Sequence, residues 1–485
     1  MSLLWVCHLI SASIPMSKVQ VVLITLAIYK IVLIVIGLWA SRRTNDSDDF
    51  FLGGRGLGPV VAALSYSSSA ASAWALLGLS GIAYVYGVST IWVAFGSISS
   101  MFVVWYWIAP RLMTFSREHE LITLTEIIAY DTNNEMRGKI ILLSTFIIVF
   151  SFVFYVAAQF QGAGTTFATT FDMSMRTSIA MGAAIIMIYT LLGGFWAVSV
   201  TDALQGSLMA LAAIVLPVSA FIAVGGLAGL LSGLAAVSTP EQLSLTGGNL
   251  GLMALGIVIG GLCIGLGTYG QPHLMARIMA LRDEKAMRQA RVITIVWYLL
   301  VFLGMWFVGL VGHVLHAGLE NSEQIFFVML DSLFSPVLGA IFLAAVLSAI
   351  MSTADSQLLS AAAAIAHDLG VAGDDPKKVL LISRLTIVAL VGVSVLVAIY
   401  MPAKIFSRVL FAWMALGAAF GPVLFARLAG ARIKAQGVFL SILTGFCLTV
   451  VLSFFPNAPG DIVERLVPFC TASLVLCLFR QKIQH

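Results

Sequence analysis

The stretch LSYSSSAASAWALLGLSG, residues 64–81, decides the fold that the sequence predicts. It lies inside a long hydrophobic segment, yet it carries five serines between residues 65 and 72 and two glycines further on. Lipid cannot hydrogen-bond a backbone, so non-helical chain at membrane depth survives only against protein or a water-filled cavity. The composition favours a membrane helix that unwinds near its middle and frees carbonyls for a substrate or an ion. Close helix packing through small residues explains it equally well, and both interpretations stay open.

The composition of the whole chain is that of a polytopic membrane protein. Of its 485 residues, 60% are hydrophobic and only 10% are charged, against about 25% charged in a soluble protein. The net charge of +4 lies in membrane loops and does not indicate nucleic-acid binding. Five cysteines show no paired or metal-binding spacing, and seven histidines are scattered without a partner nucleophile. These patterns argue against an enzyme.

A helix that spans a membrane needs about 20 apolar residues, and the sequence offers thirteen such segments. They are 18–40, 59–86, 90–112, 138–162, 178–198, 202–226, 249–270, 292–316, 335–366, 379–401, 405–427, 435–456 and 462–479. Residues 1–17 are interpreted as a peripheral tail, with Met1 and Met16 both open as the start of translation. Residues 18–485 then form a single transmembrane domain.

Lysine and arginine are unevenly divided between the predicted loops. Twenty of the 26 basic residues fall in one set of alternate loops, within 42–55, 111–139, 277–291, 377–384, 427–434 and 480–482. Because cytoplasmic loops carry the excess of lysine and arginine, this pattern predicts an N-terminus outside and a C-terminus in the cytoplasm.

Three charged residues lie inside or at the edge of the predicted spans, where a charge is expensive and indicates function by default. Lys30 has no acidic partner in its own span, and we interpret it as a snorkelling or protein-facing lysine. Asp202 begins the sixth span, where a helix N-cap and a functional carboxylate explain it equally well. Asp355 stands among hydroxyl side chains, which favours a functional role.

A second interrupted span is GIVIGGLCIGLGTYGQP, residues 256–272, in which six glycines and a proline weaken the helix. The two interrupted spans are the second and the seventh, so they take matching places in two sets of five helices. Such a pair predicts an inverted-repeat transporter with a central binding site. We expect the repeats at 59–226 and 249–427, with peripheral helices at 435–479.

Four segments, taken in order, resemble the sodium:solute symporter family. They are FLGGRGLG (51–58), YTLLGGFWAVSVTD (189–202), GLGTYGQPH (265–273) and AIMSTADSQLL (349–359). The resemblance runs from about residue 20 to residue 430 and is strongest to the bacterial members that transport proline. It implies an all-α LeuT-type fold with five-plus-five inverted repeats, in the plasma (inner) membrane.

The resemblance also implies that sodium, Na+, is the coupling ion. Its implied ligands are the backbone carbonyls of Ser68, Ala71 and Ala349 and the hydroxyls of Ser352 and Thr353. Oxygen ligands suit a hard cation, and neutral ones give an affinity low enough for the ion to leave.

Four further residues are expected on the sodium path or in coupling: Arg55, Asp202, Asp355 and Ser356. Asp202 matches a family aspartate on the sodium exit path, which in some members helps to hold a second sodium ion. Arg55 matches an arginine thought to assist coupling. Ser356 follows Ser352 by one helical turn and shares its face.

Residues expected to contact the solute come from the two interrupted spans and the fourth span. They are Ser72, Ala73, Trp74, Tyr155, Ile264, Thr268, Gln271 and Pro272. The proline-transporting members carry an aspartate at the position of Ala70, a tryptophan at Ile264 and a tyrosine at Thr268. The last two departures remove aromatic walls, which predicts a solute larger than proline or another small amino or organic acid.

The sequence therefore predicts a secondary active symporter that takes up an amino acid, proline or a related small solute, by alternating access. Its expected partners are that solute and the lipid bilayer. A proton-coupled or uncoupled transporter on the same fold is an alternative, favoured by Ala70. A transporter-like membrane sensor is a weaker one, because only two helices and a short tail follow residue 430.

Overall fold

The computed structural model is an all-helical bundle that describes residues 17–41, 52–192, 194–371, 373, 375–401, 403–455 and 459–481. Some sequence predictions lie outside these residues. They concern the tail before Ser17 with both candidate start sites, the basic residues Arg42, Arg43 and Lys482, and the motif residues Phe51 and Gly193. Within the described ranges, the β-type pairings are two isolated bridges, Leu57 with Leu281 and Ile433 with Arg480.

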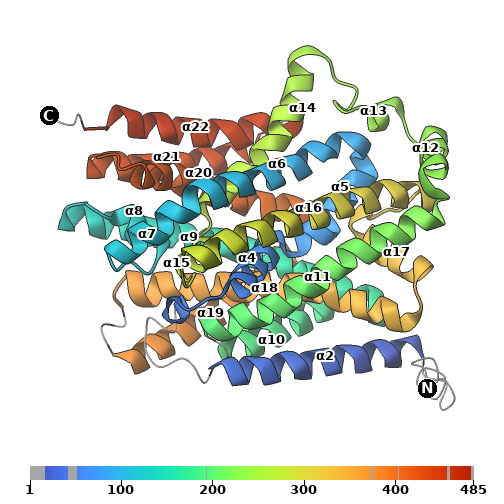
Figure 1. Ribbon diagram of the computed structural model, residues 1–485, viewed down its shortest axis with the longest axis horizontal. Helices are drawn as coiled ribbons and strands as arrows, with labels where there is room; N and C mark the ends of the chain where they lie inside the picture. Colours follow the sequence, from blue (N-terminus) through green and yellow to red (C-terminus); the bar gives the residue numbers. More distant parts are fainter. Residues whose placement is uncertain are drawn as a thin grey trace.

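Helices follow one another along the whole described chain (Figure 1). They are α2 (Lys18–Ser41), α4 (Pro59–Ala73), α5 (Leu79–Tyr86), α6 (Ile91–Val103), α7 (Ala109–Glu118), α8 (Leu124–Ala129), α9 (Asn134–Phe171), α10 (Met175–Leu192), α11 (Phe195–Ala223), α12 (Gly226–Val237), α13 (Pro240–Leu243), α14 (Gly251–Cys263), α15 (Pro272–Met279), α16 (Glu284–Leu315), α17 (Ile325–Leu333), α18 (Pro336–Ala363), α19 (Pro376–Tyr400), α20 (Ile405–Leu428), α21 (Ala435–Leu452) and α22 (Ile462–Leu478).

The number of spanning helices differs from the thirteen predicted. In the described part of the chain, ten helical runs are long and apolar enough to cross a membrane. One of them, Pro59–Glu118, holds two predicted spans because the chain turns sharply at Gly87, where φ is +70°. α10 offers only a shorter apolar stretch, Met175–Ile188, and α22 is only 17 residues long. Each of the thirteen predicted spans overlaps a helix in the described part of the chain, but those two helices are short for a full crossing.

The boundary between the fifth and sixth predicted spans is wrong by several residues. α10 ends at Leu192, and α11 begins at Phe195 after Gly194, whose backbone is extended. Counting the glycine pair at 193 and 194 as part of the fifth span placed the predicted start of the sixth span at Asp202. Asp202 instead lies two turns inside α11.

α4 and α18 cross at the centre of the bundle. α4 packs against α11, α16 and α18, while α18 also contacts α2, α9 and α11. Almost all side chains of α18 from Ala340 onward are buried, as expected for a helix that is apolar on every side. α2 runs along one edge of the bundle, and α21 and α22 pack together at the opposite edge (Figure 1).

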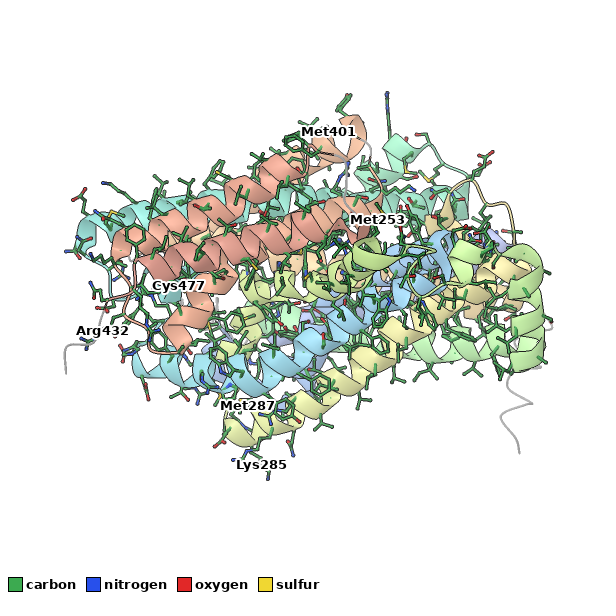
Figure 2. All side chains as sticks on the ribbon, turned by 90° about the horizontal axis from the view of Figure 1, so that it is seen from above. Met253, Lys285, Met287, Met401, Arg432 and Cys477 are labelled. Carbon is green, nitrogen blue, oxygen red and sulfur yellow. The ribbon has the colours of Figure 1, made fainter. Side chains whose placement is uncertain are left out.

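The basic loops gather at one end of the bundle. Lys285 and Arg432, from two of these loops, both lie in the left half of the side-chain view (Figure 2). Met253 of α14 and Met401, just after α19, lie in its right half (Figure 2). The helix axes run roughly between these two ends (Figure 1).

Candidate functional site

The helix that contains the serine-rich stretch breaks at Ser72. Its φ of 49° and ψ of −168° are not helical, and a residue with a Cβ rarely adopts them. A π-helical turn, Trp74–Gly78, then leads into α5. The helix thus unwinds as the sequence predicted. Gly78 and Gly81 lie tightly against Phe406 and the backbone of Glu323, so the packing interpretation also holds for this stretch.

The second interrupted span breaks in the same way. α14 passes into a 3₁₀ segment, Ile264–Gly270, and α15 begins at Pro272 after an extended Gln271. The glycines allow α20 to approach this segment closely. A Cβ at Gly267 would lie 1.9 Å from the Trp413 ring, and one at Gly270 would lie 2.0 Å from the Leu416 carbonyl.

Oxygen atoms from α4 and α18 meet beside the first break. The Thr353 hydroxyl lies 3.4 Å from the Ser68 carbonyl, 2.9 Å from the Ser69 carbonyl and 3.0 Å from the Ala349 carbonyl. The Ser352 hydroxyl lies 3.3 Å from the same Ala349 oxygen. Four of the five sodium ligands implied by the resemblance are therefore neighbours. The fifth, the Ala71 carbonyl, accepts the Trp74 N–H at the end of α4.

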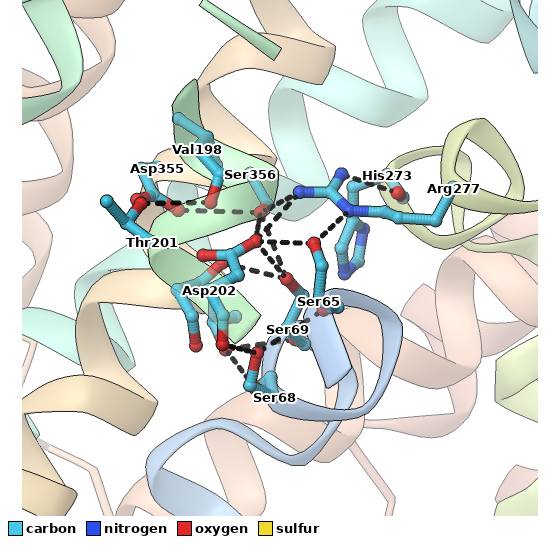
Figure 3. Close-up of polar contacts among 12 residues, drawn as sticks. Ser65, Ser68, Ser69, Val198, Thr201, Asp202, His273, Arg277, Asp355 and Ser356 are labelled. Atoms are coloured by element: carbon cyan, nitrogen blue, oxygen red, sulfur yellow. Dashed lines mark hydrogen bonds and ion pairs between the residues drawn. The ribbon is translucent and has the colours of Figure 1, made fainter. Parts of the chain in front are cut away.

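The carboxylate of Asp202 lies next to this set of oxygens and is fully buried. Its Oδ2 accepts from the hydroxyls of Ser65 at 2.7 Å, Ser69 at 3.3 Å and Ser356 at 3.5 Å. Ser65 and Ser69 come from α4 and Ser356 from α18, so the carboxylate joins three helices (Figure 3). Of the two interpretations left open by the sequence, the N-cap is wrong because Gly194 is the N-cap of α11.

Arg277 of α15 supplies the positive charge for this carboxylate. Its guanidinium lies 3.2 Å from Asp202 Oδ2, and its side chain is only 2% exposed. The sequence grouped Arg277 with the basic loops, and that grouping is wrong for this residue. α15 begins inside the bundle, directly after the 3₁₀ segment, so its first turns are still buried.

Asp355, a second fully buried carboxylate, lies on α18 beside Ser356. Its Oδ1 accepts from the Ser356 hydroxyl at 3.4 Å, and its Oδ2 has no hydrogen-bond partner among the described residues. Ser356 also lies 3.0 Å from the Ser69 hydroxyl. Lys30 of α2 points into the protein and contacts Met351 of α18, as the protein-facing interpretation predicted.

Arg55 lies on the α7–α8 side of the molecule. Its guanidinium donates to the Ser116 hydroxyl and carbonyl, both at 3.2 Å, and to the Leu121 carbonyl at 2.9 Å. It therefore ties the segment that enters α4 to the junction between α7 and α8.

Two polar side chains of α9 lie within hydrogen-bonding distance of the Ser72 hydroxyl. The Tyr155 hydroxyl lies 3.5 Å from it and the Gln159 amide 3.4 Å. Gln159 also accepts the Ala73 N–H at 3.2 Å, which satisfies a backbone group freed by the break. These contacts hold the unwound backbone against α9.

A small cavity, with room for about one water molecule, lies beyond the break, between both interrupted spans and α20. It is lined by Trp74, Ile264, Phe406, Val409, Leu410 and Trp413. Gln271 lies behind it and donates to the Trp413 carbonyl at 3.1 Å. Thr268 instead faces Ser100 of α6, with 3.2 Å between the hydroxyls. The pocket thus has aromatic walls from Trp74 and from Phe406 and Trp413 of α20, although Ile264 and Thr268 supply none.

A larger cleft, of about 40 Å³, lies toward the basic end of the bundle. Arg277, Ser356, Pro272, Thr123 and Asp368 are among its lining residues. It therefore reaches from the Asp202 cluster to the end of α18 and to α8.

The junction of α8 with the end of α18 is polar. Glu126 of α8 pairs with His367 at 3.2 Å and accepts the Ile122 and Thr123 N–H groups. Although burial acts to raise it, the hydrogen bond from His367 and those from the backbone hold the pKa of Glu126 below its ordinary value.

Residues 50–445 match the sodium:solute symporter family. The chain belongs to this family. It is 32% identical to the osmoregulated proline transporter OpuE of Bacillus subtilis, over 94% of this chain and 93% of that one. It is 34% identical to the sodium/proline symporter of Escherichia coli, over 89% and 87% of the two chains. As a symporter-family member the chain is a multi-pass membrane transporter, not an enzyme.

Two solved structures share the fold of this symporter. A Na+-coupled sialic acid symporter superimposes with a TM-score of 0.78 at 16% identity, over 96% of this chain and 99% of that one. Mhp1, a nucleobase-cation-symport-1 family transporter, gives 0.54 at 13% identity, over 90% and 95%. The predicted LeuT-type fold is confirmed.

Four residues of this symporter's site were missed by sequence reasoning: Gln159, Arg277, Phe406 and Trp413. Phe406 and Trp413 lie in α20, which carries no interruption to draw attention to it. Gln159 stands one turn after Tyr155 on α9, and this spacing was a usable signal. Arg277 stands one helical turn after His273, the last residue of the motif GLGTYGQPH. Extending that motif by one turn would have found it.

Proposed function

We propose that this chain is a sodium-driven symporter that takes up proline, or a solute of very similar size and chemistry, by alternating access. The relatives named above are described as proline transporters. The solute class is carried over from those relatives and is supported by the lining of the cavity. The choice of sodium is supported by the oxygen set, which is the group of carbonyl and hydroxyl oxygens between α4 and α18.

The observation that carries the proposal is the contact of the oxygen set with the helix break. Ser68 and Ala71 belong to the last turns of α4, directly before Ser72. A sodium ion held by these carbonyls and by Ser352 and Thr353 ties the end of α4 to α18. The ion thereby fixes the backbone that bears Ser72 and Trp74. Solute affinity and ion affinity then rise together, since coupling between two ligands is reciprocal.

The residues that line the cavity suit a small solute with an apolar body. The rings of Trp74, Phe406 and Trp413 offer flat apolar walls for a pyrrolidine ring. The broken ends of both interrupted helices bring backbone dipoles to the same place, as needed by a carboxylate and an ammonium group.

The cleft at the basic end supports a release path on the cytoplasmic side. We place the N-terminus outside and the C-terminus in the cytoplasm of the plasma (inner) membrane, with repeats at 59–226 and 249–427. Asp202 and Asp355 flank the way from the oxygen set to the cleft, and we assign both, with Ser356, to the path of the leaving ion. Arg55 is assigned to the movement of α4 against α7 and α8.

Proton coupling is the second candidate. Asp355 is a buried carboxylate with one oxygen that has no hydrogen-bond partner among the described residues. Such a group is stabilised by taking up a proton. Ala70 stands where the proline-transporting members carry an aspartate, which also leaves room for a different ion.

Uptake into proteoliposomes separates the two candidates. The purified full-length chain is reconstituted, and labelled proline uptake is followed under an inward sodium gradient, under an inward proton gradient, and under neither. Sodium-driven symport predicts accumulation with sodium alone and competition by unlabelled proline. Accumulation under the proton gradient without sodium would overturn it. A panel of unlabelled amino and organic acids as competitors then defines the solute.

A further inference from the structure

α2 lies outside both proposed repeats, yet one of its faces is buried against the bundle. It packs against α11 and α18 along one edge of the molecule (Figure 1). Leu26 and Leu33 of α2 are buried, and Ile28 and Ile31 are exposed. Lys30 follows Leu26 by four residues and precedes Leu33 by three, so it lies on the buried face. A lysine on the protein face of a spanning helix is costly and indicates a function.

The side chain of Lys30 meets the face of α18 that carries Asp355. Its ammonium contacts the Met351 sulfur, and the neighbouring Tyr29 hydroxyl contacts the Ser348 hydroxyl. Ser348, Met351 and Asp355 follow one another at spacings of three and four residues, so they lie on one face of α18. A thioether is a weak hydrogen-bond acceptor, so Met351 does not satisfy the ammonium. The carboxylate with which Lys30 interacts electrostatically is Asp355.

Asp355 needs a positive charge nearby, because a buried carboxylate is costly unless it is paired. Its side chain is fully buried, and its Oδ2 has no hydrogen-bond partner among the described residues. It interacts electrostatically with Asp202 and Arg277, but the Arg277 guanidinium hydrogen-bonds to Asp202. One arginine beside two carboxylates leaves one negative charge unbalanced. Lys30 supplies the missing positive charge from outside the repeats.

We propose that Lys30 is a positioning residue for sodium release, which neutralises Asp355 so that no unbalanced negative charge holds the ion on its way from the oxygen set to the cleft. This inference rests on the proposed sodium-driven symport and adds to it a working part in α2. Asp355 stands two residues after Thr353, an implied sodium ligand. At that range, and without bulk water between them, an unbalanced carboxylate attracts the ion strongly. A lysine and a carboxylate together carry no net charge, so the pair lets the ion pass.

The sodium dependence of uptake tests the inference through a double-mutant cycle. The full-length chain is reconstituted into proteoliposomes, and labelled proline uptake is measured against sodium concentration. Lys30→Met removes the charge and keeps an unbranched side chain. Asp355 is then unbalanced, which should lower half-saturating sodium by about tenfold to a hundredfold. Asp355→Asn leaves Lys30 unpaired and should raise it. The double variant lacks both charges, and its half-saturating sodium should return toward the parental value.

A second measurement separates ion release from ion binding. With saturating sodium on both sides of the membrane, labelled proline exchanges for unlabelled proline while sodium stays bound. Net uptake, in contrast, requires the ion to leave. Lys30→Met should therefore slow net uptake more than it slows exchange. A lysine that only packs α2 against α18 would affect both rates equally.

Two control variants separate the charge of Lys30 from the packing of α2. Lys30→Arg keeps the positive charge and should keep the parental half-saturating sodium. Leu26→Ala loosens the same buried face one helical turn earlier without changing any charge. It should lower the amount of folded protein and leave half-saturating sodium at the parental value.

Three results would overturn the inference alone, in a parent that depends on sodium. They are an unchanged half-saturating sodium in Lys30→Met, a double variant in which the two single effects simply add without any return, and equal slowing of net uptake and exchange. Asp355→Asn carries the test where Lys30→Met does not fold, because an unchanged half-saturating sodium there would also overturn it. A parent without sodium dependence would overturn the proposed function and this inference together.

Discussion

Trp74 is the residue at which the ion set and the solute cavity meet. Its backbone N–H bonds to the Ala71 carbonyl, one of the implied sodium ligands. Its indole N–H lies 3.3 Å from the Ala70 carbonyl, and its ring packs edge-on against Phe406 over the cavity. Trp74 therefore contacts the broken helix and also forms a wall of the pocket.

Trp74→Ala should weaken apparent solute affinity. The lost ring contacts are worth about 2–3 kcal/mol, which raises the proline concentration at half-maximal uptake by tens of fold. The measurement is uptake against proline concentration at saturating sodium. Trp107→Ala is the control, since Trp107 packs against Phe425 away from the cavity. Equal affinity in parent and Trp74→Ala would show that the solute binds elsewhere.

The interrupted helix is the element whose strain shapes the site. The backbone of Ser72 has a conformation that glycine tolerates and that residues with a side chain avoid. Its hydroxyl is approached by Tyr155 and Gln159, which explains why a serine stands there. The polar contacts of the Ser72 hydroxyl with Tyr155 and Gln159 therefore offset the backbone strain at Ser72.

Ser72→Gly should stabilise the fold and weaken binding at the same time. Relief of the strain is worth about 1–3 kcal/mol, and the extra freedom of glycine in the unfolded chain offsets about 0.5–1 kcal/mol. Thermal unfolding in detergent should shift upward, while proline affinity falls with the lost hydroxyl. Ser72→Ala should lower affinity without the gain in stability. A lower unfolding temperature for Ser72→Gly than for Ser72→Ala would contradict the assigned strain.

The α8–α18 junction should make stability depend on pH. A carboxyl with a lowered pKa stabilises the folded state above its unfolded pKa, and this contribution is lost as the pH falls. Glu126→Gln should therefore lower stability by about 1–2 kcal/mol near neutral pH, with the difference from the parent shrinking in acid. Unfolding temperatures from neutral to acidic pH give the readout. A constant difference across that range would rule out the ion pair as its source.

Sequence patterns located the two interrupted helices because both depend on local composition. Serine clusters and glycine runs weaken a helix wherever they occur. The same patterns could not locate the start of α11, because Gly194 stands in an apolar run that reads equally well as helix interior. Asp202 was therefore recognised as important but placed at the wrong point of its helix.

At the scale of the whole molecule, the site depends on contacts between segments far apart in the chain. Arg277 reaches Asp202 across 75 positions, and Ser69 reaches Ser356 across 287. No local pattern reports such pairs. The resemblance to a family supplied the sodium ligands, whereas Trp413 and the pairing of Arg277 with Asp202 became visible only in the folded bundle.

The two ends of the bundle should face opposite sides of the membrane. Lys285 lies in the first turn of α16 at the basic end, and Glu241 lies in α13 at the other end. Both side chains are exposed, and each is replaced by cysteine. In a variant without the five native cysteines, a membrane-impermeant thiol reagent should label Glu241→Cys in intact cells. Lys285→Cys should react only after the membrane is opened. The reverse pattern would invert the proposed topology.

The dependence of proline uptake on sodium in the parent and in Thr353→Ala tests the central claim most directly. Thr353 joins three carbonyls at the centre of the oxygen set, and a bond to a charged group is worth about 1.5–3 kcal/mol. Half-saturating sodium should therefore rise about tenfold to a hundredfold in Thr353→Ala. High sodium should restore proline affinity. Thr449→Ala, a buried threonine bonded within α21, should match the parent. An unchanged sodium dependence in Thr353→Ala would place the driving ion outside the contact between α4 and α18.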